Sequence, residues 1–321
     1  MSSSMADATR RRVRPAGGSR ARLRDEPSAA AFVPIRHVLC PVDFSDGSRA
    51  VVDRAVALAR PTRADITGLF VLPVVLPVRQ EKSSRPSPQA LDVGVVSALT
   101  EDLEGLLGPA RQAGVAVRAR VRTGDCVAQI LDQARATEAD LVVMGTHGRS
   151  RLARFGLGSV AAAVLRKSPC PVLTVAGPSA ARTARSTARI ERILCALDLS
   201  ERSAHTLAYA VSLARSTGAA LTLVHVLEGV RRPSARAQAS AEARQRLHAA
   251  GLTAGMPGGA LEEVAVSGRP YREIVRLADA RPVDLIVMGT GGDEGSTAGR
   301  VVRRSAAPVL TVRPAASRDR P

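Results

Sequence analysis

Glycine and serine residues recur at fixed spacing between Leu141 and Val175, and these residue types suit the binding of an anion. Gly145 and Gly148 follow a short apolar run. The pair Gly158-Ser159 then precedes an apolar segment with helical periodicity. Backbone N–H groups can approach an anion closely at glycine, which has no Cβ, and the first turn of a helix offers unpaired N–H groups at the positive end of its dipole. The stretch therefore predicts a phosphate-binding loop between a buried strand and a helix.

The spacing G-x2-G-x9-G-S, followed by an apolar helix and Pro171-Val172-Leu173, closely resembles the nucleotide-binding signature of the universal stress protein family. The resemblance covers about residues 34 to 313 and implies a chain that binds ATP, with or without Mg2+. It implies that the glycines and the serine hold the ribose and phosphates. It also implies that an acid after the first strand and the backbone of a valine at the end of the second contact the adenosine moiety. The residues expected to bind this cofactor are Asp43, Val71, Gly145, His147, Gly148, Arg149, Gly158 and Ser159.

The histidine and the arginines of this loop are interpreted as binding residues. A general base needs an orienting partner and a reacting atom within reach, and the sequence supplies neither for His147. We therefore expect His147 to make a polar contact near the phosphates, and we predict no catalytic residue. Arg149, Arg151 and Arg154 could neutralise phosphate charge, although a charged loop can equally be solvated.

Buried strands and amphipathic helices alternate around this loop. An apolar run from His37 ends at Asp43, and Ser45 is expected to cap a helix that continues to about Arg60. Proline residues interrupt the stretch from 73 to 90, which is predicted to be a long loop. Alternation of this kind predicts a parallel sheet with right-handed crossovers.

The second part of the chain repeats the first, so we predict two copies of one α/β domain. Residues 192–200 match 37–45, residues 284–290 match 140–146, and Gly295-Ser296 matches Gly158-Ser159. By resemblance, each copy is an open, five-stranded parallel-sheet domain of the Rossmann-like, adenine-nucleotide α-hydrolase-like class with strand order 3-2-1-4-5. This order reverses between strands 1 and 4, where α/β sheets bind their ligands.

The predicted boundaries follow from these matches. The expected segments are a disordered basic tail at 1–33, a first domain at 34–177, a linker at 178–189, a second domain at 190–313 and a tail at 314–321.

The second copy departs from the motif. Only Asp293 and Glu294 separate its glycines Gly292 and Gly295, where the first copy has nine residues. Because two acids repel a triphosphate and a short loop cannot wrap it, we expect the second domain to bind ATP poorly. Its main role would be to complete an intramolecular pseudo-dimer. Family members often form homodimers, so the resemblance also allows further association of two chains.

Composition argues against several other functions. The net charge of +17 would suit nucleic acid, but only 2% of the residues are aromatic and no stacking platform is evident, so we predict no binding of nucleic acid. No apolar run reaches the length of about 18 residues that a membrane span needs. The four cysteines form no CxxC pair, which suits a reducing cytoplasm and predicts neither zinc nor disulfides.

The leading hypothesis is a cytoplasmic, ATP-binding regulatory module of the stress response that acts on an unknown protein partner. The alternative is a slow ATPase or an adenylate-transferring enzyme of the adenine-nucleotide α-hydrolase group. Such an enzyme should carry a loop like SGGxDS after strand 1, and residues 43–48 lack its paired glycines. The sequence also lacks a GxxxxGK[ST] motif, which excludes a P-loop ATPase.

Overall fold

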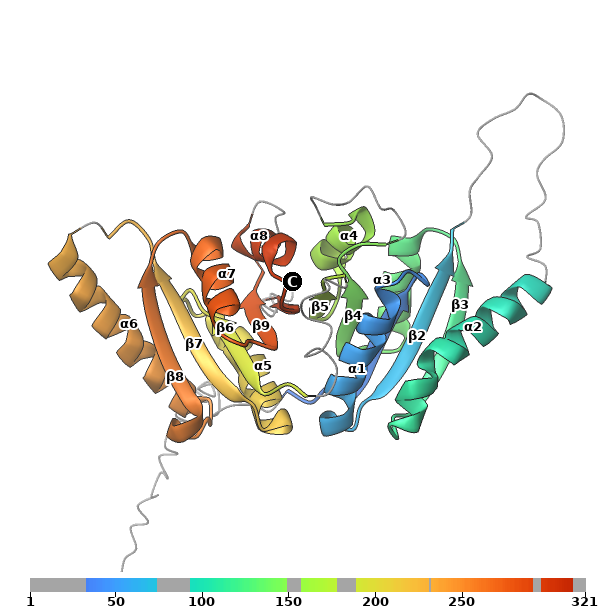
Figure 1. The fold of residues 1–321 in the computed structure, drawn as a ribbon, viewed down its shortest axis with the longest axis horizontal. Coiled ribbons are helices and arrows are strands. Elements are labelled where there is room, and N and C mark those ends of the chain that lie inside the picture. The colour runs from blue at the N-terminus through green and yellow to red at the C-terminus, as the bar shows by residue number, and fades with distance from the viewer. Residues whose placement is uncertain are drawn as a thin grey trace, which may run out of the picture.

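The computed structural model describes residues 33–73, 93–148, 157–177, 189–230, 232–290 and 296–313. Strands and helices alternate along this part of the chain, and helices cover both faces of one sheet (Figure 1). Residues 33–177 are called the N-terminal half below, and residues 189–313 the C-terminal half.

Five parallel strands form the sheet of the N-terminal half in the order β3-β2-β1-β4-β5. The predicted order 3-2-1-4-5 is therefore confirmed for this half. The elements are β1 (His37–Val42), α1 (Ser48–Thr62), β2 (Asp65–Leu72), α2 (Val93–Gln112), β3 (Val117–Thr123), α3 (Cys126–Ala136), β4 (Leu141–Gly145), α4 (Ser159–Lys167) and β5 (Val172–Val175).

The C-terminal half repeats this arrangement in the order β8-β7-β6-β9-β10, again with parallel neighbours. The predicted repeat is thus visible element by element. The elements are β6 (Arg192–Ala196), α5 (Ser203–Thr217), β7 (Ala220–Leu227), α6 (Pro233–Thr253), the short 3-10 helix η1 (Gly258–Ala260), β8 (Leu261–Ser267), α7 (Pro270–Ala280), β9 (Leu285–Gly289), α8 (Thr297–Arg304) and β10 (Val309–Val312).

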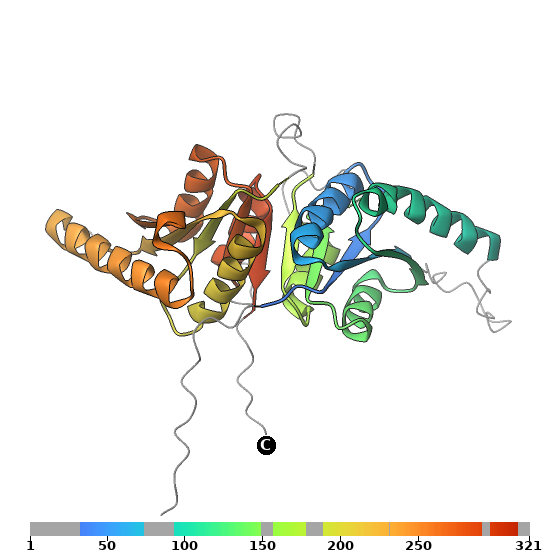
Figure 2. The same ribbon diagram turned by 90° about the horizontal axis from the view of Figure 1, so that it is seen from below.

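The two halves share a single ten-stranded sheet, a feature that the sequence reading did not predict. Strands β5 and β10, the last of each half, pair antiparallel, with Leu173 opposite Leu310. Two buried threonines add side-chain bonds across this join: the Thr174 hydroxyl donates to the Val309 carbonyl at 3.2 Å, and the Thr311 hydroxyl donates to the Val172 carbonyl at 3.0 Å. Figure 2 shows the halves meeting along these central strands.

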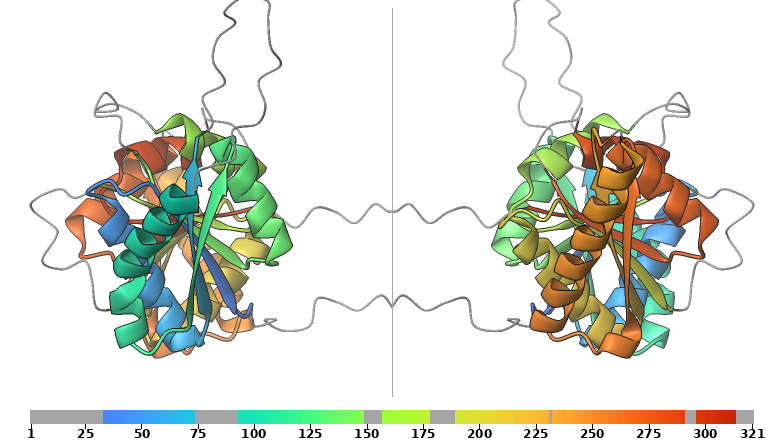
Figure 3. Two further views of the ribbon diagram at one scale, coloured as in Figure 1. Left: turned by 90° about the vertical axis from the view of Figure 1, so that its right-hand side faces the viewer. Right: turned by 90° about the vertical axis from the view of Figure 1, so that its left-hand side faces the viewer.

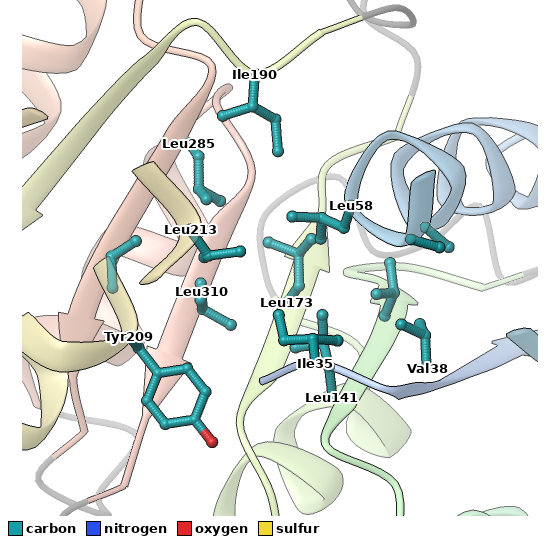
Figure 4. Close-up of a cluster of buried hydrophobic side chains, with 14 of the residues drawn as sticks. Ile35, Val38, Leu58, Leu141, Leu173, Ile190, Tyr209, Leu213, Leu285 and Leu310 are labelled. Carbon is teal, nitrogen blue, oxygen red and sulfur yellow. The ribbon is translucent and has the colours of Figure 1, made fainter. Parts of the chain in front are cut away.

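Aliphatic side chains fill the core on both faces of the sheet, as expected for a chain with so few aromatic residues. Helices lie on either side of the strands when the molecule is viewed along the sheet (Figure 3). On the face covered by α1 and α5, one apolar cluster runs through both halves and includes Leu58, Leu173, Leu213 and Leu310 (Figure 4). The opposite face carries two clusters, mainly one from each half. The halves are therefore joined by shared side-chain packing as well as by the strand pairing.

Helix α1 begins later than predicted. Gly47 occupies its N-cap position without a side-chain hydrogen bond, and the first helical residue is Ser48. The prediction that Ser45 caps this helix is therefore wrong. Its hydroxyl instead donates to the Asp43 carboxylate at 2.6 Å, so the carboxylate competes successfully for it.

All four cysteines are free thiols, and two of them lie inside strands. Burial raises the pKa of Cys40 to about 12 and raises that of Cys195 further. Because the thiolate is the reactive form, we expect an aromatic disulfide reagent near pH 8 to leave both strand cysteines unmodified in the native chain. Cys126 and Cys170, which are partly exposed, should react slowly.

Mass spectrometry of the modified chain before and after denaturation checks this expectation. Modification of Cys40 without unfolding would contradict the burial of β1.

Among the helices of the described residues, none is long and apolar enough to span a membrane.

Candidate nucleotide-binding site

The predicted site residues of the N-terminal half converge at the carboxyl ends of β1 and β4, which are neighbours in the sheet. Asp43 directly follows β1, and Gly145 ends β4. A Cβ placed on Gly148 would lie 2.7 Å from Oδ2 of Asp43. Residues from two distant parts of the sequence are thus in close approach, as the reversal of strand order predicts. The residues Asp43, Gly145, Gly148 and Gly158 are called the N-terminal site below.

A tight turn after β1 holds the Asp43 side chain. Its Oδ1 accepts hydrogen bonds from the Ser45 backbone N–H at 3.1 Å, from the Ser45 hydroxyl at 2.6 Å and from the Ser48 hydroxyl at 3.1 Å. Phe44 adopts a left-handed φ of 59°, which turns the chain sharply away from the strand. The turn therefore fixes one carboxylate oxygen, and the other oxygen faces the Gly148 segment.

Helix α4 presents its first turn at the same edge of the sheet. Gly158 occupies the N-cap position and provides no side-chain cap, so the first N–H groups of α4 keep their hydrogen-bonding capacity for a ligand. The Gly158 N–H donates to the Thr146 carbonyl at 2.8 Å, and a Cβ on Gly158 would lie 3.1 Å from the same oxygen. The glycine thus allows the helix start to pack closely against the segment after β4.

The other predicted residues are placed in different ways. Val71 is the second-last residue of β2, it lies in register with Arg122 of β3, and its buried side chain packs in the apolar cluster. Ser159 is exposed at the first position of α4. His147 is exposed, and its Nδ1 lies 2.9 Å from the Thr146 hydroxyl. Arg149, with Arg151 and Arg154, lies outside the described residues.

Thr146 is a residue that the sequence reading missed. Its side chain is 4% exposed, its N–H donates to the Val175 carbonyl at 3.0 Å, and its carbonyl receives the Gly158 N–H. Thr146 therefore ties the segment after β4 to both β5 and the start of α4. The sequence signal that could have revealed it is its position between Gly145, which ends an apolar run, and His147.

The C-terminal half carries a crevice of about 560 Å³ at the equivalent place, called the C-terminal crevice below. Its lining includes Asp198, whose Oδ1 accepts hydrogen bonds from the backbone and the hydroxyl of Ser200 and from the hydroxyl of Ser203. Partial burial alone would raise the pKa of Asp198, but these hydrogen bonds and nearby Arg202 lower it below its ordinary value. The carboxylate is therefore ionised at neutral pH.

The two helices at the corresponding sites start differently. The hydroxyl of Ser296, the N-cap residue of α8, accepts a hydrogen bond from the Gly299 N–H at 3.2 Å. Helix α4 has no such bond at its glycine cap. The contracted acidic loop predicted to weaken ATP binding falls within residues 291–295, outside the described residues. No group of three or more histidine, cysteine, aspartate or glutamate side chains able to hold a metal ion occurs in the described part of the chain.

Comparison with known proteins gives consistent matches for both halves. The model of the universal stress protein family matches residues 34–176 and 189–313. A universal stress protein of Methanocaldococcus jannaschii is 29% identical over 143 residues, which cover 44% of this chain and 83% of the relative. A universal stress protein of Mycobacterium tuberculosis is 30% identical over 168 residues, which cover 50% of this chain and 55% of the relative. The crystal structure of a universal stress protein from Archaeoglobus fulgidus shares the fold, with a TM-score of 0.64 and 23% identity over 88% of this chain and 98% of that one.

Proposed function

Because the chain belongs to the universal stress protein family, matched once in each half, we propose that it is an ATP-binding regulatory module whose N-terminal half holds the nucleotide. The observation that carries this proposal is the uncapped start of α4 beside Gly148 and Asp43. An uncapped helix start is a ready anion site, and the adjacent glycines let phosphate oxygens reach the backbone.

Each residue of the N-terminal site has a distinct part in this proposal. The N–H groups of the first turn of α4, together with Ser159, would receive the phosphates. Gly148 would let the chain pass close to the ligand, since any side chain there meets Asp43. The Asp43 carboxylate and the backbone of Val71 would contact the adenosine moiety. His147 would make a polar contact, since among the described residues no carboxylate orients its ring for general-base catalysis.

The C-terminal half is proposed to complete an intramolecular pseudo-dimer through the β5–β10 join. The proposed domains are residues 34–177 and 190–313, which a linker at 178–189 connects. Free thiols at all four cysteines suit a reducing compartment, so a cytoplasmic location is part of the proposal. A protein partner would respond to the nucleotide-bound state, and its identity follows from pull-down with and without ATP.

Calorimetric titration of ATP into the whole chain tests the proposal, together with analysis of the nucleotide content of freshly purified protein. The informative variant is Gly158→Ser, which gives α4 the cap residue of α8. A serine hydroxyl would take one of the helix N–H groups, and its Cβ would crowd the Thr146 carbonyl at 3.1 Å. Because a hydrogen bond to a charged group contributes about 1.5–3 kcal/mol, ATP affinity should fall by about 10- to 100-fold.

The matched control is Gly177→Ser, at a glycine whose Cβ would meet nothing within 4 Å. It should bind ATP as the wild-type chain does. Unchanged ATP affinity in Gly158→Ser would remove the helix start from the site, and absence of ATP binding in the wild-type chain would end the proposal.

A further inference from the structure

The C-terminal crevice has the framework of the N-terminal site but different chemistry at the positions that touch a ligand. The side chain that faces the strand-ending glycine differs between the two halves. In the N-terminal half, a Cβ added to Gly145 would lie 3.7 Å from Cγ2 of Val51. Gly289 at the equivalent position faces Thr206, with 3.2 Å between its added Cβ and Oγ1. A hydroxyl therefore replaces a methyl group at the base of the C-terminal crevice.

The end of the C-terminal crevice that would meet phosphates is poorly suited to them. The Ser296 hydroxyl already accepts the N–H of Gly299, so the start of α8 is capped by its own side chain. The charged side chains that line the crevice are Asp198, Glu228 and Arg202, which carry one more negative than positive charge. A triphosphate would compete with the serine for α8 and would be repelled by the carboxylates.

The other polar groups of the C-terminal crevice suit hydroxyl groups. Oδ1 of Asp198 is occupied by the turn, whereas no hydrogen bond from the described residues reaches its Oδ2. An ionised carboxylate oxygen is a strong acceptor for sugar hydroxyls. The Nδ1 of His225 lies 2.9 Å from the Leu197 carbonyl, which can only accept, so Nδ1 carries a hydrogen. In this tautomer Nε2 is available as an acceptor, and the ring forms part of the crevice lining.

Part of the remaining lining is apolar and can hold a flat ring. Val226, Ile274 and Met288 lie along the crevice, and Ile274 and Met288 are buried. The volume of about 560 Å³ falls in the range of small-molecule sites. The crevice thus combines an apolar wall with hydroxyl-binding acceptors, and its helix start is already capped in part by Ser296.

From this combination we propose that the C-terminal crevice binds an uncharged nucleoside and rejects nucleoside triphosphates. The ribose hydroxyls bind Asp198, and the base lies against Ile274 and Met288. The chain then carries two sites of different selectivity. The claim that the two halves bind different ligands rests on the proposed function. Nucleoside binding in the C-terminal half does not require ATP binding in the N-terminal half.

Titration of adenosine and of ATP into the whole Gly148→Val chain tests this proposal. The substitution places a side chain onto Asp43 and so blocks the N-terminal site. We expect adenosine to bind this variant at one site, at least tenfold more tightly than ATP. Asp198→Asn in the same background should weaken adenosine binding by tenfold or more. The matched Asp43→Asn change should leave adenosine binding as it is.

A gain of function provides a second readout. Ser296→Gly removes the serine hydroxyl that caps α8. In the Gly148→Val background it should reduce the ratio of adenosine affinity to ATP affinity by at least threefold. Ser305→Gly, at the other end of the helix, should leave this ratio unchanged. Absence of adenosine binding to the Gly148→Val chain, with its thermal unfolding unchanged, would overturn the proposal. Equal affinity for ATP and adenosine would overturn the claimed selectivity. Loss of ATP binding in the wild-type chain alone would instead overturn the proposed function and leave the nucleoside site standing.

Discussion

Replacing Gly148 with valine is expected to reduce ATP binding to the N-terminal half by at least 100-fold. A Cβ at this position would lie 2.7 Å from Oδ2 of Asp43, a separation that real Cβ atoms essentially never show. Asp43 cannot easily retreat, because its other oxygen accepts three hydrogen bonds from the turn at Ser45 and Ser48. The segment after β4 must therefore move away from β1, and the helix start and the carboxylate lose their common ligand position. A loss of 100-fold corresponds to about 2.7 kcal/mol, a change typical of a displaced binding group.

Two further variants make this result interpretable. Gly148→Ala introduces the same Cβ with the least added volume and should lose ATP affinity in the same direction, but less. Gly177→Val places the larger side chain in open space and should bind ATP as the wild-type chain does. Calorimetry gives the affinities, and thermal unfolding shows whether each variant is folded. Wild-type affinity in a folded Gly148→Val chain would show that the ligand does not lie between β1 and β4.

The convergence of Asp43 with the glycines could be predicted from the sequence because it depends on strand order alone. Parallel strands of known order end at the same edge, so residues after β1 and β4 must meet there. The start of α4 at Ser159 could also be predicted, since Gly158-Ser159 precedes a clear apolar period. These features follow from local pattern and topology, which the sequence carries directly.

Features that depend on competition between neighbouring groups could not be predicted in the same way. Ser45 has the usual chemistry of a helix cap, but the Asp43 carboxylate takes its hydroxyl and the helix starts at Ser48. The pair Gly-Ser occurs before both α4 and α8, yet the N-cap residue is Gly158 in one helix and Ser296 in the other. A shift of one residue in the helix start reverses the role of the serine, and sequence alignment of the two copies does not reveal it.

The join between the halves was also beyond the sequence. The repeat predicts two equivalent sheets, and either sheet could end in a free edge strand. Both β5 and β10 are short, apolar and fully buried, and such edges pair readily with another strand. Because each half offers the same strand, antiparallel pairing satisfies both edges at once. The apolar cluster that spans the join turns two domains of similar design into one packed unit.

Truncating the leucines at this join should destabilise the whole chain and not one half alone. Leu173 and Leu310 are register partners across β5 and β10, and their side chains are 0% and 1% exposed. Leu173→Ala and Leu310→Ala should each lower the free energy of unfolding by about 2–5 kcal/mol, because each leaves a cavity that the surrounding core cannot fill. The loss of unfolding free energy in the double variant should differ from the sum of the two single losses by about 0.5–3 kcal/mol, because the two side chains share one region of the core.

Urea denaturation followed by circular dichroism measures these changes, with Leu252→Ala as the control. Leu252 is a leucine of α6 with 46% of its surface exposed, and its truncation should change the free energy of unfolding by less than about 0.5 kcal/mol. A shared core predicts that either leucine variant shifts a single transition of the whole chain. If Leu173→Ala instead separated two transitions and shifted only one, the halves would fold independently. The β5–β10 pairing would then be a contact between two stable domains, without a contribution from one half to the stability of the other.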